Sequence, residues 1–364
     1  MGLLTKKIIN FFPHPFGLDL SDLSIKVVQL DEEGRGDRVI GYGEAAIAPR
    51  SVADGKILNA DAVAEAIRKA IANAHPRPIS TKRVVCSLPE TKAFLRIITI
   101  PRMEEEEARE AVKWEMEANI PLPIDQVYYD WQILEDPLFA QDRKKMSVLV
   151  VAVARKVVDQ FVDILQKVGL TVVGLEIESI AQARGLLADK EASKTTMIVD
   201  IGDRRTSFLI STHNIPCFTS SVPLSGESFT DAIAKALGLS NKEAEKTKIT
   251  YGIGSAIKND HIFHAVESVL ENLITEIKKS MDFYVTGLQY AASIDQIILC
   301  GGGSKTKGLV PYLSQRLGKD IILGNPWVNF DMGKNLPVMP RDTSIQFSTA
   351  IGLALKELHY DDLA

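Results

Sequence analysis

The stretch "VDIGDRRTSFLI" at residues 199–210 decides how this sequence is interpreted. It has the apolar composition of a buried strand, but two aspartates and a glycine interrupt it. Asp and Gly are common turn formers, so two strands joined by a turn are one explanation. Residues 16–30, "FGLDLSDLSIKVVQL", repeat the arrangement about half a chain earlier, with Asp19 in the place of Asp200. Two such hairpins in matching places predict a chain built from two similar halves.

Composition and charge place the chain among ordinary soluble globular proteins. Its 364 residues are 46% hydrophobic and 24% charged, and the formal net charge is −5. A nucleic-acid binder usually has a basic balance or patch, so no nucleic-acid partner is expected. The three cysteines are far apart and not in metal-ligand spacing, which favours a reduced, cytoplasmic protein. No apolar run reaches the ~18 residues of a membrane span, and residues 1–15 are expected to form a loose N-terminal arm.

Apolar periodicity predicts strands that alternate with helices, which is typical of an α/β protein. Ser240 and Glu243 have the spacing of a capping box at a helix start. Strands are expected on either side of each Asp-containing turn. Helices are expected at 59–74, 103–120, 155–169, 179–187, 226–237, 241–251, 262–288 and 345–358.

The Asp and Gly residues of the two turns suggest a phosphate site. Backbone N–H groups in a tight glycine-containing turn form a concave site for anions, and glycine lets a ligand approach closely. A carboxylate beside phosphates repels them unless a divalent cation lies between. Mg²⁺ takes oxygen ligands from one or two Asp residues plus the phosphates. Two facing turns of this kind are therefore expected to clamp a Mg-nucleotide polyphosphate in a cleft between the halves.

A third segment, "ILCGGGSKTKGL" at 298–309, has the pattern of a strand, three glycines and a helix. Such a bend places a helix N-terminus beside a ligand. On its own a triple glycine is weak evidence for a phosphate or nucleoside site. Its position after the two Asp-containing turns makes it the third member of an ordered set.

This ordered set resembles the superfamily of actin, Hsp70 and the sugar kinases, over nearly the whole chain. The resemblance implies a bilobed fold of two RNase H-like halves and a site for ATP with Mg²⁺, with Asp19 and Asp200 on the metal side. The first phosphate motif is matched by Asp19, Leu20, Ser21, Asp22, Leu23, Ser24 and Lys26. The second is matched by Asp200, Gly202, Asp203 and Thr206, and the adenosine motif by Gly301, Gly302, Gly303 and Ser304.

The resemblance also implies roles for residues outside the three motifs. Glu178 falls where Hsp70-type members carry an acidic residue near the attacking water, so it is the candidate catalytic residue. Glu245 and Lys248 fall where such proteins hold the adenosine, and Gly226 is expected at the nucleotide as well. Two simpler interpretations stay open: Lys26 as a surface lysine of a strand, and Glu178 as a solvated helix cap.

A segment in the first half decides the branch of the superfamily. It has the pattern of a small inserted α+β block, which the cell-division protein FtsA and its relatives have. The stretches "LPETKAFLRIITIP", "EAVKWEMEANIPLP" and "STAIGLALKEL" resemble the family of the type IV pilus assembly protein PilM. FtsA carries a C-terminal amphipathic membrane anchor, whereas this sequence ends in the acidic "LKELHYDDLA". The expected organisation is an arm at 1–15, a first half at 16–88 and 146–196, the insertion at 89–145 and a second half at 197–364.

Two departures from the superfamily pattern concern the phosphate turns. Ser21 stands where the family usually has Gly. A serine has less freedom to adopt positive φ; it could crowd the phosphates, or its hydroxyl could donate a hydrogen bond. Arg204 and Arg205 stand where small residues are common.

The resemblance to the PilM family implies a cytoplasmic, ATP-binding scaffold of the type IV pilus machine at the inner face of the inner membrane. Its implied partner is the N-terminal cytoplasmic peptide of the membrane protein PilN, docked beside the insertion, with other pilus motor components as further partners. Membrane association is then indirect. Weak or no ATP hydrolysis is expected, because no activating group such as an arginine finger is evident. The alternatives are a small-molecule kinase of the sugar-kinase type and an FtsA-like polymerising protein.

Overall fold

The computed structural model describes residues 13–32, 37–120, 122–136, 138–139, 142, 144–254, 260–288, 292–330, 338–356 and 358. Most of the predicted N-terminal arm and most of the acidic ending lie outside the described residues. Among the helices of the described ranges, none combines the length and the apolar character that crossing a membrane requires.

The first half is built on a six-stranded sheet in the order β11–β7–β1–β2–β3–β6. Strands β1 and β2 form the predicted hairpin, and β7 runs parallel to β1. A large apolar core covers one face of this sheet and includes the fully buried Phe16 and Leu18, and a second core lies on the other face. The strands are β1 (Phe16–Leu20), β2 (Ser24–Glu32), β3 (Asp37–Ala46), β6 (His75–Pro76), β7 (Arg83–Leu88) and β11 (Thr171–Ile177), with helices α1 (Ala60–Ala72) and α3 (Arg155–Lys167).

The second half repeats this topology in a five-stranded sheet, in the order β16–β15–β12–β13–β14. Each sheet has a three-stranded antiparallel meander, and its first strand also pairs in parallel with a later strand. The register is shared as well, because Asp19 lies opposite Lys26 and Asp200 lies opposite Ser207. The duplication that the two hairpins suggest is thus present in the structure. The strands are β12 (Thr195–Ile201), β13 (Thr206–Thr212), β14 (Ile215–Val222), β15 (Gln296–Cys300) and β16 (Asp320–Leu323).

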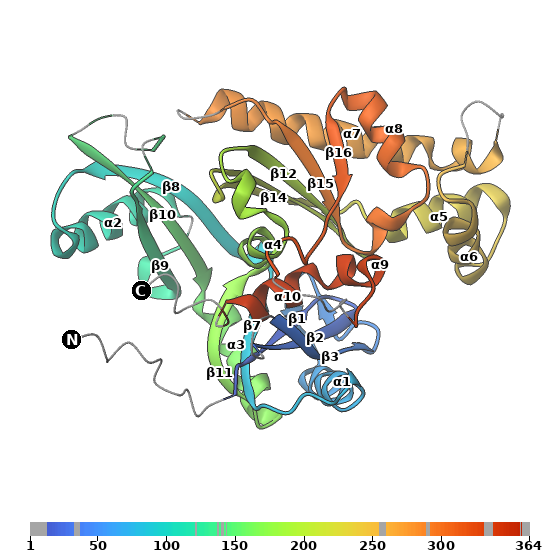
Figure 1. Cartoon of the computed structure of the whole chain (residues 1–364), viewed down its shortest axis with the longest axis horizontal. Helices are drawn as coiled ribbons and strands as arrows, with labels where there is room; N and C mark the ends of the chain where they lie inside the picture. Colours follow the sequence, from blue (N-terminus) through green and yellow to red (C-terminus); the bar gives the residue numbers. More distant parts are fainter. Residues whose placement is uncertain are drawn as a thin grey trace, which may run out of the picture.

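Helices cover the second sheet and extend away from it, to the right in Figure 1. The long helix α7 buries one apolar face against the sheet, from Phe263 to Tyr284. The capping box of α6 is confirmed, since the Ser240 side chain accepts from Glu243 N and the Glu243 side chain returns a bond to Ser240 N. The helices are α5 (Gly226–Leu237), α6 (Asn241–Tyr251), α7 (His261–Gly287), α8 (Leu309–Leu317) and the short α9 (Arg341–Ser344).

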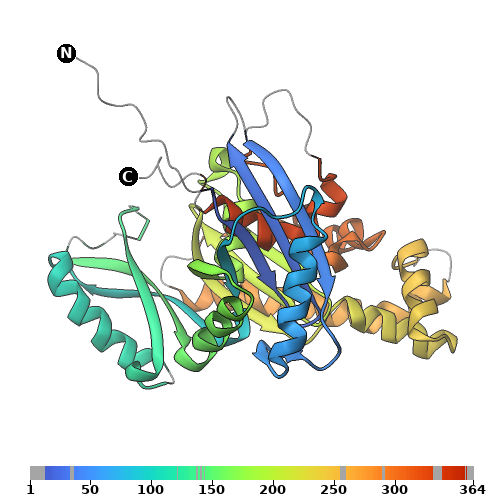
Figure 2. The same ribbon diagram turned by 90° about the horizontal axis from the view of Figure 1, so that it is seen from below.

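The insertion forms a separate layer, one helix on a three-stranded sheet, beside the first half and remote from α5 and α6 (Figure 2). Its core lies between the sheet and the apolar face of α2, which includes Ala108, Val112 and Met116. Strand β10 pairs with β8 and β9 up to its end, well past the expected boundary at residue 145. We therefore propose that the insertion runs to residue 154. Its elements are β8 (Ala93–Pro101), α2 (Glu105–Asn119), β9 (Val127–Leu134) and β10 (Lys145–Ala154).

Two helices, α4 (Glu178–Leu186) and α10 (Ser348–Leu355), lie between the two sheets (Figure 1). They pack closely because Gly352 has no side chain: a Cβ there would lie 1.8 Å from the carbonyl oxygen of Ala181. The helix predicted at 345–358 begins instead with a 3₁₀ turn, η6 (Ile345–Phe347), before α10. Helix α10 also packs on β1 and β2, so the last helix of the described chain covers the first strands.

Candidate functional site

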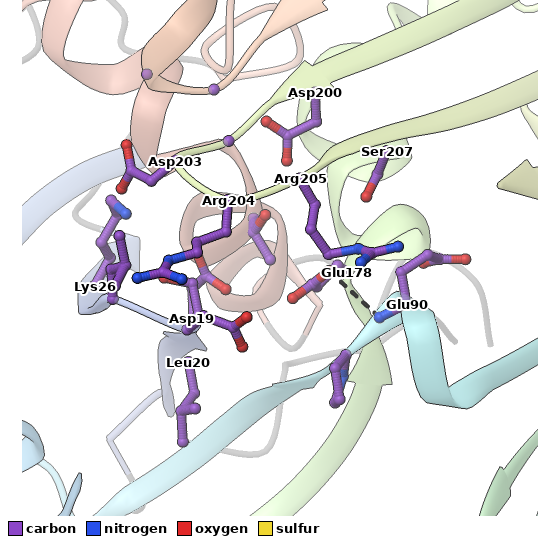
Figure 3. A pocket seen from close by; sticks show the side chains of 18 of the residues that line it. Asp19, Leu20, Lys26, Glu90, Glu178, Asp200, Asp203, Arg204, Arg205 and Ser207 are labelled. Carbon is purple, nitrogen blue, oxygen red and sulfur yellow. Dashed lines mark hydrogen bonds between the residues drawn. The ribbon is translucent and has the colours of Figure 1, made fainter. Parts of the chain in front are cut away.

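A cavity of about 250 Å³ lies where the two Asp-containing turns face each other (Figure 3). We refer to it as the cleft. Both halves line it, and the beginning of the insertion adds residues from one side. Of the residues predicted for the site, those that line the cleft are Asp19, Leu20, Ser21, Asp22, Leu23, Lys26, Glu178, Asp200, Gly202, Asp203, Gly301 and Gly302.

Asp19 and Lys26 form the charged pair of the first half. Asp19 Oδ1 accepts a hydrogen bond from Ser87 Oγ at 3.1 Å, and Lys26 Nζ donates to Ser24 Oγ at 2.8 Å. Burial raises the pKa of Asp19, and the positive charge of Lys26 opposes this rise. Only 9% of Lys26 is exposed, so the interpretation of Lys26 as a surface lysine is wrong.

Asp200 occupies the equivalent place in the second half. Its Oδ2 accepts a hydrogen bond from Gln182 Nε2 of α4 at 2.6 Å. Burial raises the pKa of Asp200 to about 6. Gly301 of the glycine-rich turn lies directly against this carboxylate: its φ is +78°, and a Cβ there would lie 2.0 Å from Asp200 Oδ1. The second and third motifs therefore meet at Asp200, and only glycine fits at the meeting point.

Ser21 does not strain the first turn. Ser21 N donates to Ser24 O at 3.0 Å, and the Ser21 hydroxyl donates to the same oxygen at 3.0 Å and accepts from Ser24 N at 3.2 Å. Its φ is not positive. Asp22 holds another turn, because its carboxylate accepts from Asp54 N and Gly55 N, each at 3.1 Å. The Ser21 and Ser24 amides are therefore engaged within the turn itself, and Asp22 has a structural role.

Two residues of the phosphate motifs lie behind the cleft surface. Ser24 is 6% exposed and accepts the hydrogen bond from Lys26, so it orients that lysine. Thr206 is fully buried and donates to Leu224 O at 2.6 Å. Neither side chain is among those lining the cleft. For Thr206, the structure favours a role in joining β13 to the chain before α5.

Of the residues predicted for the adenosine, Gly301 and Gly302 line the cleft, whereas the others lie next to it: Gly226, Glu245, Lys248, Gly303 and Ser304. Lys248 Nζ donates to Gly226 O at 2.9 Å and pairs with Glu245 Oε2 at 2.7 Å. Gly226 N donates to Gly202 O at 2.9 Å, so this cluster adjoins the second turn. Gly303 and Ser304 are buried in the 3₁₀ turn η5 (Gly302–Lys305), where the Ser304 hydroxyl donates to Gly301 O at 2.7 Å. An adenosine role for this cluster stays a prediction.

Glu178 lies at the first turn of α4, and Glu90, which the sequence analysis did not identify, lies beside it (Figure 3). Glu178 Oε2 accepts from Glu90 N at 3.4 Å, and Glu90 Oε2 accepts from Ser179 N at 3.3 Å. Burial raises the pKa of Glu178 well above its usual value, and the charges of Asp19, Glu90 and Asp200 add to this rise. A solvated helix cap is therefore the wrong description of Glu178. In the 3₁₀ turn η1 (Glu90–Lys92), Glu90 caps α4, whose N-cap Ile177 has no capping side chain.

The carboxylates of the cleft fit a divalent cation shared with a ligand. Asp19 is buried, Glu178 and Asp200 are half-buried, and the negative charge of Asp19 raises the pKa values of the other two. A hard cation offsets such repulsion. Within the described ranges, no three acidic, His or Cys side chains are grouped closely enough to hold a metal by themselves. Mg²⁺ held by Asp19 and Asp200 would therefore depend on phosphate oxygens and water for its other ligands.

Comparisons with known proteins agree with this architecture. A family model described as type IV pilus assembly protein PilM matches residues 17–358. A solved structure of a PilM–PilN type IV pilus biogenesis complex has a TM-score of 0.79 and 27% identity, covering 95% of this chain and 98% of that one.

More distant relatives share the fold. Cell division protein FtsA of Enterococcus hirae is 24% identical over 368 residues, which cover 90% of this chain and 81% of FtsA. The structure of MreB5 of Spiroplasma citri bound to ADP has a TM-score of 0.57 at 13% identity, covering 96% of this chain and 97% of that one. The predicted actin-like α/β fold and the relation to FtsA are confirmed.

Proposed function

The chain belongs to the family of the type IV pilus assembly protein PilM, and from this premise we propose that it is an ATP-binding, actin-like scaffold of the pilus assembly complex. The observation that carries the nucleotide part is the cleft with two equivalent turns, each presenting one carboxylate from its own half whose pKa is raised by burial. A ligand that contacts both turns at once joins the halves. Nucleotide state would then change the geometry between them by its differential affinity for open and closed forms.

Different residues of the cleft are proposed to bind different parts of the nucleotide. The backbone amides of the two turns and Lys26 bind phosphate oxygens, because amides in tight turns and a buried ammonium attract anions. Asp19 and Asp200 hold Mg²⁺ on its protein side. When bound, Mg²⁺ neutralises phosphate charge. The cluster of Glu245, Lys248 and Gly226 supports the adenosine end.

Weak or absent hydrolysis follows from the state of Glu178. Burial raises the pKa of Glu178 well above its usual value, which favours the protonated, uncharged form over the carboxylate that would accept a proton from water. Phosphoryl transfer depends on positioning and on charge stabilisation of the transition state. Glu178, which accepts a hydrogen bond from Glu90 N, binds and orients the attacking water but accelerates hydrolysis little. ATP therefore acts as a structural ligand.

The proposed partner is a PilN-like membrane protein, bound through its N-terminal cytoplasmic peptide. A related structure is that of a PilM–PilN complex, which supports this choice. The insertion is the proposed docking part, because it stands apart from the two halves with its own core and carries the exposed Trp114. Binding would hold the chain at the cytoplasmic face of the inner membrane, so the membrane association is indirect. Other pilus motor components are further proposed partners.

One experiment tests both parts. The melting temperature is measured with and without Mg-ATP, and capture of a PilN N-terminal peptide is measured with the full chain and with residues 90–154 replaced by a short linker. At about 100 times Kd, nucleotide adds about 2.7 kcal/mol, which raises the melting temperature by several degrees. No shift with millimolar Mg-ATP contradicts the nucleotide part. Equal peptide capture by a folded deletion variant contradicts the docking part, and multiple-turnover phosphorylation of a small molecule contradicts the scaffold role.

A further inference from the structure

An ion pair crosses the cleft from one half to the other. Arg205, in the turn between β12 and β13, places Nη1 at 3.2 Å from Oδ1 of Asp54. Asp54 lies in the first half, in the two-residue turn between β4 (Val52–Ala53) and β5 (Lys56–Ile57). The two residues are 151 positions apart in the sequence. The guanidinium therefore reaches from one half to a carboxylate of the other.

The Asp54 side of the pair is fixed. Asp54 N and Gly55 N both donate to the carboxylate of Asp22, and Thr91 Oγ1 donates to Asp54 O at 3.3 Å. Three hydrogen bonds thus hold the backbone of the turn against the first half and the start of the insertion. The Asp54 side chain is 69% exposed. It is a solvated carboxylate on a fixed support.

The Arg205 side is fixed along one edge of its guanidinium. Nε donates to Ser221 Oγ at 3.0 Å and Nη2 donates to Ser221 O at 3.3 Å. Both contacts come from β14 of the same half. The remaining edge, with Nη1, faces Asp54 and the cleft. In Figure 3 this guanidinium extends toward Glu178 and Glu90, the end of the cleft where hydrolysis would occur.

Of the cations Lys26, Arg204 and Arg205 of the cleft, Arg205 has the ion-pair partner that is most exposed, since the Asp54 side chain is 69% exposed and those of Glu44 and Glu227 are each 44% exposed. Lys26 is buried between Ser24 and Glu44, and Arg204 pairs with Glu227 of its own half at 3.4 Å. An ion pair with a largely exposed carboxylate contributes about 0–1 kcal/mol, so exchanging that partner costs little. Two parallel bonds to a phosphate are stronger than this contact, because both partners are fully charged and their geometries match.

We propose that Arg205 binds the terminal phosphate of a nucleoside triphosphate, and that Asp54 is its partner when this phosphate is absent. This inference rests on the proposed function of the cleft as a nucleotide site. The preformed contacts with Ser221 mean that Arg205 is already oriented before the ligand arrives. A diphosphate, which is one phosphate shorter, leaves the Asp54–Arg205 pair in place. Arg205 is thus the residue that distinguishes ATP from ADP.

The test measures Mg-ATP and Mg-ADP affinity by calorimetry for the parent chain and four variants. Arg205→Gln weakens ATP about tenfold to a hundredfold and ADP less than threefold. Arg205→Lys gives an intermediate loss for ATP, because it keeps the charge and loses the planar fork. Asp54→Asn tightens ATP by about twofold to fivefold, because the competing carboxylate charge is removed. Arg204→Gln, the neighbouring control, has the smallest effect on the ATP-to-ADP ratio.

The opposite signs at Asp54 and Arg205 are the decisive result. If Asp54→Asn weakens ATP as much as Arg205→Gln does, the pair is a structural clamp and the inference is wrong. If the parent binds ATP and folded Arg205→Gln and Arg205→Lys bind it equally well, the inference fails while the nucleotide site stands. If the parent binds neither Mg-ATP nor Mg-ADP, both the proposed function and the inference fail.

Discussion

The turns 21–24 and 202–205 have the same backbone hydrogen bond and differ in three of their four side chains. Each is closed by the same hydrogen bond: Ser21 N donates to Ser24 O at 3.0 Å, and Gly202 N donates to Arg205 O at 2.9 Å. Neither Ser21 nor Gly202 has a positive φ. The serine is therefore accommodated, and its hydroxyl strengthens the turn from within. Equivalent backbones are retained, while the chemistry that they carry differs.

The two halves also place their cations at positions that are not equivalent. In the first half, strand residue Lys26 faces Asp19; in the second half, the matching residue is Ser207, opposite Asp200. The second half carries its cleft cation in the turn, at Arg205, where the first half has Ser24. The two turns of the cleft thus match in their backbone hydrogen bond, but the two halves carry their positive charges at positions that are not equivalent. The following predictions test whether this asymmetry has energetic consequences.

The largest expected effect is on the pH dependence of stability, through Asp19 and Asp200. Burial raises the pKa of Asp200 to about 6 in the folded chain, above its unfolded value, so the folded state binds the proton more tightly. Asp200 therefore reduces stability as pH rises through about 6, by on the order of 3 kcal/mol. Asp200→Asn, which mimics the protonated form, is expected to raise the melting temperature at pH 8 and to leave it nearly unchanged at pH 4.

Asp19→Asn is the matched control. Burial also raises the pKa of Asp19, but Lys26 opposes the rise, so the gain at pH 8 should be smaller. Asp200→Asn should in addition weaken ATP binding more when Mg²⁺ is present than when EDTA has removed it. Melting curves at both pH values check the first point, and equal gains for the two variants would show that the lysine does not distinguish the halves.

The second expected effect concerns Lys26 and Ser207, which occupy matching register positions. Lys26→Met removes a charge-assisted contact to phosphate, worth about 1.5–3 kcal/mol, so ATP affinity should fall roughly tenfold to a hundredfold. Ser207→Ala should change it less than threefold. Calorimetry with Mg-ATP provides the measurement. Comparable losses at both positions contradict the assignment of Lys26 as the phosphate cation of the first half.

The smallest effect is expected at Ser21. Ser21→Gly removes the hydroxyl contacts with Ser24 and should destabilise the chain by about 0.5–1.5 kcal/mol. It should not tighten ATP by more than about twofold, because the turn already has its ordinary geometry. Denaturant unfolding and calorimetry measure the two quantities. A tenfold gain in ATP affinity would instead mean that the serine crowds the phosphates.

Much of this architecture could be predicted from the sequence because its signals are local. The Asp-containing turns, the alternation of strands and helices and the capping box at Ser240 depend on residues only a few positions apart. The glycine-rich turn is also a local pattern, and its order after the two hairpins identified the superfamily. The spacing of neighbouring residues is enough to predict such features.

The rest depends on contacts between distant segments, which no local pattern shows. Glu90 meets Glu178 across 88 positions, and Asp54 meets Arg205 across 151. The Thr206 hydroxyl donates to the carbonyl oxygen of Leu224, 18 positions away, and its role as a ligand residue stays a prediction. The later end that we propose for the insertion depends in the same way on the pairing of β10 with β8 and β9.

The position of α10 has a consequence for how the chain is made. Strand β1 leaves the ribosome long before α10, which covers it. Until α10 is synthesised, the apolar face that includes Val28 and Leu30 has no cover. Long-range contacts of this kind slow folding, and until they form, intermediates expose apolar surface that promotes aggregation. The first half is therefore expected to complete its folding only after translation of the second, and nascent chains halted before α10 should be chaperone substrates.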